Sequence, residues 1–199
     1  MSKHKQSSFI LASASPRRKT LLLEAGYDFE IIISNVNESI SEDTDISPTE
    51  FATNLAFAKA LDVAKKYPDK LVLGADTIVD FEGEIIGKAA DAEHAEEITR
   101  KLFSKPHKVI TAVALIRLCD NVKIIKYDTT VVYPRQMTTV QIAEHIAGNS
   151  WQGKAGAYAI QETGDDFVEK IEGSLTNVMG LPMEIINALL PDLIHHQGN

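Results

Sequence analysis

The chain has 199 residues, of which 44% are hydrophobic, and its 28 acidic residues outnumber its 20 basic residues to give a net charge of −8. This charge disfavours partners that attract basic proteins, namely nucleic acid polymers and anionic membranes. The length predicts one domain with a sizeable hydrophobic core.

The ends of the chain and its single cysteine suggest where the protein works. The first eight residues are polar and the first apolar run, Phe9 to Ala12, is short, so we expect neither a signal peptide nor a membrane span. Cys119 has no cysteine partner within the chain, which favours the reducing cytoplasm. We expect flexible ends at residues 1–8 and 192–199 and a single domain over residues 9–191.

The first predicted helix begins where an apolar run is interrupted by serines. Ser15 is a good N-cap, and Pro16 suits the first helical position because its missing N–H has no partner there anyway. The first turn then carries three cations: Arg17, Arg18 and Lys19. The positive end of the helix dipole opposes these charges unless an anion offsets them, so the segment predicts a phosphate site that includes Ser13. A solvated first turn explains so short a motif equally well.

The next elements are a strand, a polar loop and a helix. Residues 29–34 predict a strand, and the acidic loop 35–45 contains Glu38, which would usually be solvated. The capping box Ser47-Pro-Thr-Glu50 predicts a helix to about residue 66. Lys59 lies in this helix between two alanines, where it can point inward or reach water as most lysines do.

The apolar strand predicted over residues 71–79 is interrupted by Asp76 and Thr77. An ionised carboxylate in such a strand is costly unless a cation, a metal or several donors meet it. An aspartate that closes a strand through its own backbone is the commoner explanation for a single residue. A hairpin over residues 80–88 follows and ends at Lys88.

The second half of the chain predicts three more helices and two long strands. The helices begin near Asp91, Thr138 and Pro182 and end near Phe103, at Gly148 and before Pro191; the strands cover residues 109–118 and 122–132. Together the elements predict an α/β fold with a twisted mixed sheet and flanking helices. Lys154 lies in a glycine-containing loop that can fold over a ligand, and His107 is either a base or a structural histidine.

Several short motifs follow one another along almost the whole chain. They are L-A-S-A-S-P-R-R at 11–18, Glu38 after Asn-Val-Asn, A-K-A at 58–60, G-A-D-T at 74–77, G-K at 87–88, K-A-G-A-Y at 154–158 with I-Q at 160–161, and G-L-P at 180–182. In this order they resemble the Maf family of nucleoside triphosphate pyrophosphatases. The resemblance implies two lobes around a deep cleft, often a homodimer, and hydrolysis of a metal-bound nucleoside triphosphate to the monophosphate and pyrophosphate.

The same resemblance implies roles for individual residues. Those that hold the triphosphate are Arg18, Lys59 and Lys88, with Ser13, Ser15 and Lys154 beside them. Glu38 and Asp76 would bind Mg²⁺ or Mn²⁺, and Asp76 would accept a proton from the attacking water. Base selection would depend on Arg17, Thr77 and Gln161.

The substrate is less constrained than the reaction. S-P-R-R and A-D-T are similar to the branch of the family that acts on dTTP and UTP, whereas the branch that acts on 7-methyl-GTP has S-P-W-R and G-S-D-Q. The chain departs from the family pattern at Ala89, Gly153 and Glu162, which leaves CTP and modified pyrimidines open. Two other functions are a nucleotide-binding regulator of cell division and septum formation without turnover, and a module that binds an anion. Two carboxylates beside a phosphate favour the enzyme, because they repel the phosphate unless a metal intervenes.

Overall fold

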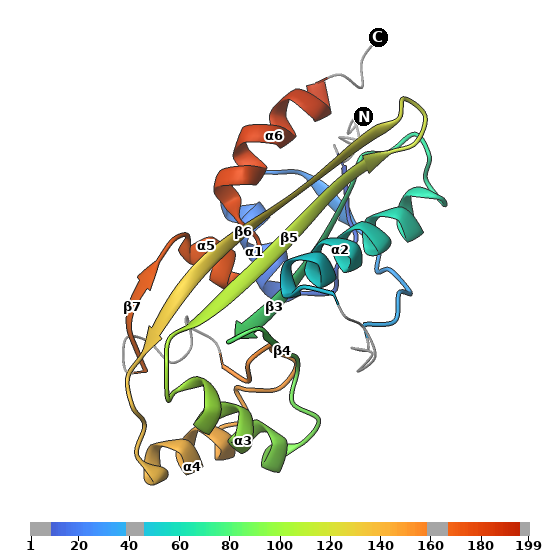
Figure 1. Ribbon diagram of the computed structural model, residues 1–199. Coiled ribbons are helices and arrows are strands. Elements are labelled where there is room, and N and C mark those ends of the chain that lie inside the picture. The colour runs from blue at the N-terminus through green and yellow to red at the C-terminus, as the bar shows by residue number, and fades with distance from the viewer. Residues whose placement is uncertain (1–8, 39–45, 159–166, 196–199) are drawn as a thin grey trace, which may run out of the picture.

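A mixed sheet of seven strands forms the centre of the computed structural model, which describes residues 9–38, 46–158 and 167–195 (Figure 1). The strands are β1 (Phe9–Leu11), β2 (Phe29–Ile31), β3 (Val72–Phe81), β4 (Glu84–Ile86), β5 (His107–Arg117), β6 (Val122–Pro134) and β7 (Val168–Glu172). Their order is β2-β1-β3-β5-β6-β7, and β4 pairs with β3 outside this path. β1 is parallel to β2 and β3, and the other pairs are antiparallel. The predicted α/β class with a mixed sheet is confirmed.

Helices cover both faces of the sheet and one of its ends (Figure 1). They are α1 (Pro16–Glu24), α2 (Pro48–Ala64), α3 (Ala92–Leu102), α4 (Thr139–Ala147), α5 (Leu175–Met179) and α6 (Met183–His195). α2 packs on one face, and α1 and α6 pack on the other. α3 and α4 lie together at the end where β4 and the start of β5 are found. None of the helices in the described residues is long and apolar enough to cross a membrane.

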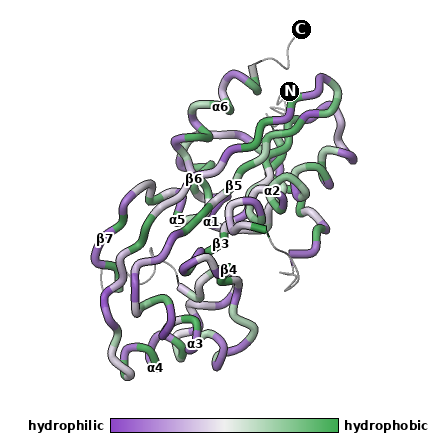
Figure 2. The backbone as a smooth tube through the Cα atoms, in the orientation of Figure 1, coloured by the Kyte–Doolittle hydropathy of each residue, from purple (hydrophilic) through white to green (hydrophobic). Residues whose placement is uncertain are grey.

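The described residues form three hydrophobic clusters, and two of them lie on opposite faces of the same strands. Successive side chains of a strand point to opposite faces. In β1, Phe9 and Leu11 therefore pack against α1 and α6, whereas Ile10 packs against α2. Figure 2 shows hydrophobic residues gathered along the central strands. The third cluster joins α3 to the far ends of β3 and β5, so the molecule has two lobes that share the long strands.

Local capping signals place the helix starts as predicted. The side chains of Ser15, Ser47, Asp91 and Thr138 each accept a hydrogen bond from a backbone N–H in the first turn of the helix that follows. The predicted hairpin is also confirmed: β3 and β4 are joined by Glu82 and Gly83, which both have positive φ.

The end of the last helix was predicted wrongly. α6 continues through Pro191 to His195, although proline removes one helical hydrogen bond and crowds the preceding turn. Leu190 is fully buried, and Leu193 and Ile194 pack against the same core, so hydrophobic burial on both sides of the proline outweighs its cost. Residues 192–195 therefore belong to this helix. The short elements β7 and α5 had no counterpart among the predicted elements.

One edge of β3 is left open between the two lobes. β1 pairs with β3 only as far as Leu73, and β4 pairs with it only from Val79 onward. Among the described residues, no strand covers this edge from Gly74 to Ile78. Asp76 and Thr77 lie in this gap, so the fold places the two polar residues of the strand where a ligand can reach them.

Candidate active site

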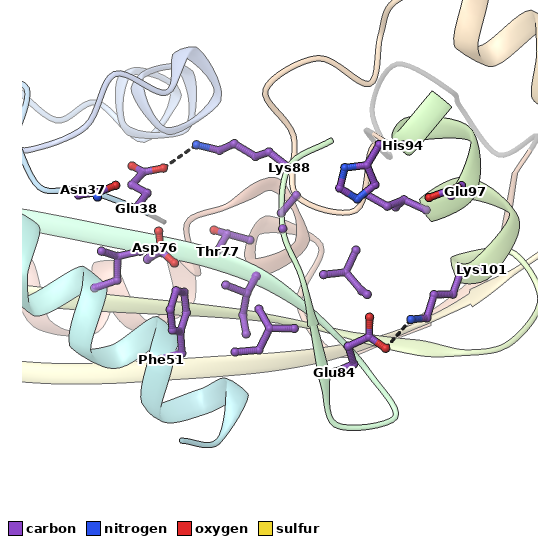
Figure 3. Close-up of a pocket in the computed structure, with 17 residues that line it drawn as sticks. Asn37, Glu38, Phe51, Asp76, Thr77, Glu84, Lys88, His94, Glu97 and Lys101 are labelled. Carbon is purple, nitrogen blue, oxygen red and sulfur yellow. Dashed lines mark hydrogen bonds and ion pairs between the residues drawn. The ribbon is translucent and has the colours of Figure 1, made fainter. Parts of the chain in front are cut away.

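Two neighbouring cavities meet at the open edge of β3. The charged cavity has a volume of about 480 Å³ and is lined by residues 13–18, Glu38, Lys59, Asp76, Thr77, Lys88, residues 152–155, Tyr158 and residues 178–180, among others. The apolar cavity has a volume of about 640 Å³. Its lining includes six large apolar side chains and several charged ones; the apolar ones are Phe51, Leu55, Ile78, Ile85, Ile86 and Ile98. Glu38, Asp76, Thr77, Lys88 and Ala155 belong to both. Figure 3 shows the lining of the apolar cavity.

Asp76 meets a buried lysine from α2. Gly74 allows this contact, because a β-carbon at this position would lie 2.5 Å from the carbonyl oxygen of Ala56 and prevent α2 from packing so closely on β3. Lys59 is 4% exposed, and its Nζ lies 2.7 Å from Oδ1 of Asp76. The buried carboxylate in the apolar strand therefore has the cationic partner that the sequence required.

Glu38 extends this pair into a chain of alternating charges. The loop that carries Glu38 is held to α2 by the Asn35 N–H, which donates to Oδ2 of Asp62 at 3.0 Å. Oε1 of Glu38 lies 2.6 Å from Nζ of Lys59, and Oε2 lies 2.6 Å from Nζ of Lys88. Figure 3 shows Lys88 reaching across from the β4 side to Glu38, above Asp76. The structure thus brings together four of the predicted site residues: Asp76, Lys59, Glu38 and Lys88.

The two carboxylates have opposite pKa shifts. Burial raises the pKa of Asp76 above its ordinary value, although Lys59 and Arg18 favour its ionised form. Burial also opposes ionisation of Glu38, but hydrogen bonds from Lys59 and Lys88 outweigh it and hold the pKa of Glu38 at about 2. Asp76 is therefore the better proton acceptor of the two, whereas Glu38 stays ionised.

Arg18 is buried and joins three parts of the cavity wall. It donates from Nε to the Gly180 carbonyl oxygen at 2.8 Å, from Nη1 to Ser13 Oγ at 3.0 Å and from Nη2 to Thr77 Oγ1 at 3.0 Å. Gly180 ends α5 with a φ of +107°, a left-handed conformation that glycine adopts easily. Three of the five guanidinium N–H groups of Arg18 thus hold the wall together.

The serines of the first loop are also bonded to one another. The Ser15 N–H, expected to face a phosphate, donates to Ser13 Oγ at 3.2 Å, and Ser15 Oγ accepts from the Arg18 N–H at 3.5 Å. Arg17 and Lys154 line the charged cavity as well. Gln161 lies outside the described residues.

The segment that carries Lys154 is attached to the strand end that carries Lys88. Lys88 and Ala155 form an antiparallel bridge, and the Gly156 N–H donates to the Gly87 carbonyl oxygen at 3.0 Å. This contact places Lys154 and Lys88 on the same side of the charged cavity.

His107 has a structural environment rather than a catalytic one. Its Nδ1 lies 3.2 Å from the Leu102 carbonyl oxygen and donates to it, so Nε2 accepts from the Tyr158 hydroxyl at 2.9 Å. Burial lowers the pKa of His107 to about 4, which keeps the ring neutral near pH 7. The ring is 3% exposed and lines neither cavity.

The described residues contain no cluster of three or more histidine, cysteine, aspartate or glutamate side chains suited to a metal. Glu38 and Asp76 nevertheless both contact the ammonium nitrogen of Lys59, so each presents a carboxylate oxygen to the same part of the cavity. Mg²⁺ is commonly held by one or two carboxylates, with substrate phosphates and water completing its shell. The donor set therefore fits a hard divalent cation that arrives with a phosphate ligand.

The charges of the two cavities differ in sign. Among the described residues that line it, the charged cavity has five cations, Arg17, Arg18, Lys59, Lys88 and Lys154, against the carboxylates Glu38 and Asp76. The apolar cavity has two lysines, Lys88 and Lys101, against four carboxylates, Glu38, Asp76, Glu84 and Glu97. A polyanion therefore fits the smaller cavity, although the protein as a whole is acidic.

Comparison with known proteins matches residues 8–193 to the family model described as Maf-like protein. The chain belongs to the Maf family. The chain is similar to proteins named dTTP/UTP pyrophosphatase. The one from Ruminiclostridium cellulolyticum is 41% identical over 94% of this chain and 96% of that protein, and the one from Geotalea uraniireducens is 43% identical over 92% of this chain and 94% of that protein. A protein of the same name from Caldicellulosiruptor saccharolyticus is 40% identical over 92% of this chain and 94% of that protein.

Among solved structures, the Staphylococcus aureus Ham1 protein aligns with 92% of this chain and 98% of its own at a TM-score of 0.48 and 12% identity. Membership of the Maf family rests on the family model and on the sequence relatives.

Proposed function

We propose that this Maf protein hydrolyses nucleoside triphosphates, with dTTP and UTP as the preferred substrates, to the nucleoside monophosphate and pyrophosphate. Relatives with that name align over almost the full length of the chain. The observation that carries the proposal is the pair of carboxylates, Asp76 and Glu38, bridged by Lys59 in a cavity with an excess of cations.

Asp76 is the proposed general base. Water attacks the α-phosphorus, the bond from this phosphorus to the bridging oxygen of the leaving pyrophosphate breaks, and the water proton passes to the Asp76 carboxylate. Its raised pKa suits this step, because a base is more effective when its pKa approaches the working pH. Lys59 holds the carboxylate in place through its 2.7 Å contact.

The cations of the charged cavity would bind the triphosphate and stabilise the charge that develops during transfer. Phosphoryl transfer is catalysed mainly by positioning and electrostatics. Lys88 and Lys154 face the cavity from one lobe, and Arg17, Arg18 and Lys59 face it from the other. Arg18 would have two roles: its hydrogen bonds hold three segments of the cavity wall together, and its positive charge attracts the triphosphate.

Glu38 and Asp76 would hold Mg²⁺ or Mn²⁺ together with the phosphates. The metal, when bound, would neutralise phosphate charge and polarise the phosphoryl group. Arg17, Thr77 and Gln161 would select the base. Arg17 and Thr77 line the cavity, which supports this role for both of them.

The test incubates the purified protein with dTTP, UTP, CTP, GTP and ATP in Mg²⁺ or Mn²⁺ and separates pyrophosphate from orthophosphate. Release of pyrophosphate with a monophosphate, fastest from dTTP and UTP, is the expected result. Orthophosphate with a diphosphate product would place the attack at another phosphorus and overturn the proposal.

We also propose that the enzyme acts in the cytoplasm, as a homodimer and without nucleic acid or membrane partners. The net charge of −8 disfavours nucleic acid and anionic membrane partners, and the single cysteine fits the reducing cytoplasm. The homodimer is proposed from the resemblance to the Maf family alone. Light scattering of the purified protein measures the oligomeric state, and a monomeric mass at working concentrations would contradict the dimer.

A further inference from the structure

Thr77 is bonded to a second threonine on the neighbouring strand. Thr77 of β3 and Thr111 of β5 lie directly opposite each other, and their hydroxyl oxygens are 3.0 Å apart. Thr111 Oγ1 also lies 2.8 Å from the carbonyl oxygen of Asn177 in α5. A carbonyl oxygen has no hydrogen to give, so Thr111 must donate its single hydroxyl hydrogen to Asn177. The contact between the two threonines then needs the hydroxyl hydrogen of Thr77.

The remaining contact of Thr77 completes the assignment. Arg18 Nη2 donates to Thr77 Oγ1 at 3.0 Å, and a guanidinium can only donate. Thr77 therefore gives its hydrogen to Thr111, uses one lone pair for Arg18 and retains one lone pair. Toward a ligand in the cavity, the Thr77 hydroxyl can act only as an acceptor.

Both ends of this chain of hydrogen bonds are fixed. Asn177 is fully buried, and its Nδ2 donates to the Val109 carbonyl oxygen at 2.9 Å and to Thr130 Oγ1 at 3.0 Å. Arg18 is held by the Gly180 carbonyl oxygen at 2.8 Å. Thr111 itself is fully buried. The direction of donation along these hydrogen bonds cannot reverse by rotation of one hydroxyl. The Asn177 carbonyl oxygen can only accept at one end, and the Arg18 guanidinium can only donate at the other.

An acceptor at this point discriminates among parts of a nucleotide. Phosphate oxygens are acceptors and gain nothing from the Thr77 lone pair, whereas uracil and thymine carry a ring N–H at N3. Cytosine has an unprotonated N3, which is an acceptor, so its lone pair would face that of Thr77. A site that leaves such groups unpaired rejects the wrong base.

We propose that Thr111 is a positioning residue for base selection, because it fixes the Thr77 hydroxyl as an acceptor for the ring N–H of uracil or thymine. This inference rests on the proposed hydrolysis of pyrimidine nucleoside triphosphates. It predicts a preference for UTP over CTP that depends on the polarity of one hydroxyl rather than on the size or shape of the pocket.

The experiment compares Thr111→Val with Thr111→Ser and measures kcat/KM for UTP and CTP. Valine has no hydroxyl, so Thr77 can turn its hydrogen toward the ligand; the preference for UTP over CTP should fall about tenfold or more. Serine retains the hydroxyl and should keep most of the preference. The matched control is Thr99→Val, which removes another fully buried hydroxyl that donates to a carbonyl oxygen, that of Ala95 at 2.7 Å in α3.

A purely structural role for Thr111 predicts a different result, namely an equal loss on UTP and CTP, and this would overturn the inference. An equal shift in the ratio for Thr99→Val would overturn it as well. Should Thr111→Val fail to fold, the wild-type enzyme is tested with UTP methylated at N3 and with the 2-pyrimidinone nucleoside triphosphate, whose N3 is an unprotonated acceptor. Turnover of the 2-pyrimidinone nucleotide as fast as UTP would contradict the inference, and slow turnover of both analogues would support it.

The same measurements separate this inference from the proposed function. A wild-type protein that releases pyrophosphate from no nucleoside triphosphate contradicts the proposed function. A wild-type protein that hydrolyses UTP and CTP equally well contradicts the selection by Thr77 and Thr111 and leaves the proposed reaction standing.

Discussion

The two cavities at the open edge of β3 differ in both size and charge. The apolar cavity is larger, at about 640 Å³, but carboxylates outnumber lysines in its lining. The charged cavity is smaller, at about 480 Å³, and cations outnumber carboxylates among its described lining residues. A nucleoside triphosphate is a polyanion, so electrostatics assign it to the smaller cavity. Size alone would give the opposite answer.

The two faces of β3 also differ, because each carries a different kind of site residue. Asp76 points to the α2 face, where it meets Lys59, and belongs to a chain of ion pairs. Thr77 points to the other face and belongs to a chain of neutral and cationic hydrogen bonds. We therefore expect Asp76 to act in the hydrolysis step and its neighbour Thr77 to act in base selection. Substitutions should therefore split into those that lower turnover on all nucleotides and those that change the preference among them.

The largest effect is expected for Asp76→Asn. We expect hydrolysis to fall by about 10²-fold or more, because the amide cannot accept the water proton, while nucleotide binding remains. The measurement is kcat for UTP together with nucleotide affinity by calorimetry. The matched control is Asp80→Asn on the same strand, where the side chain accepts from the Gly83 N–H at 2.8 Å and lines neither cavity. Turnover near the wild-type value in Asp76→Asn would move the base role elsewhere, with Glu38 next to be tested.

The second largest effect is expected for Lys59→Met. Turnover should fall about tenfold or more, because the substitution removes the ammonium beside the reacting group. Its pH profile is the sharper measurement. Activity requires ionised Asp76, so kcat/KM rises with pH through the pKa of this group. Lys59 lowers that pKa, and its loss should move the acid limb to higher pH.

Lys66→Met is the control for this change, because Lys66 pairs with Asp62 at 3.1 Å on the surface. An acid limb that stays in place in Lys59→Met would show that Asp76 is not the group whose titration limits the reaction.

Helix starts and the polar residues of β3 could be predicted from the sequence because their signals are local. A capping serine acts within three residues, and Asp76 stands out in an apolar strand whatever surrounds it. The pairing of Lys59 with both Asp76 and Glu38 depends on how closely α2 packs, which Gly74 allows only in the folded protein. The sequence motifs named these residues without showing that they touch.

Thr111 was not singled out at all. It is one polar residue in a long buried strand, and nothing local distinguishes it from a threonine chosen for strand propensity. Its position opposite Thr77 depends on the register between β3 and β5, and its donor role depends on Asn177 from a helix 66 residues away. The prediction that the last helix ends before Pro191 was wrong for a related reason. Burial of Leu193 and Ile194 depends on the folded core, and it outweighs the local signal of the proline.

Thr77→Val tests the selective face of β3. We expect kcat/KM for UTP to fall about tenfold, because one N–H of the base and one of Arg18 lose their acceptor. CTP should lose less, since its N3 offers no hydrogen to Thr77. Thr77→Ser keeps the hydroxyl and serves as the control. Equal losses on UTP and CTP would place Thr77 at the phosphates or in the fold rather than at the base.

The smallest effect is expected for Lys88→Ala, and it compares the two cavities most directly. Lys88 side-chain exposure is 55%, so water screens its charge, and we expect turnover to fall about fivefold with little change in affinity. Lys101→Ala is the matched control: Lys101 is also partly exposed, is also paired with a glutamate, Glu84, and lines the apolar cavity but not the charged one. If the triphosphate occupies the charged cavity, Lys101→Ala keeps wild-type kinetics. A loss in Lys101→Ala that equals or exceeds the loss in Lys88→Ala would place the triphosphate in the larger cavity, and the assignment by charge would be wrong.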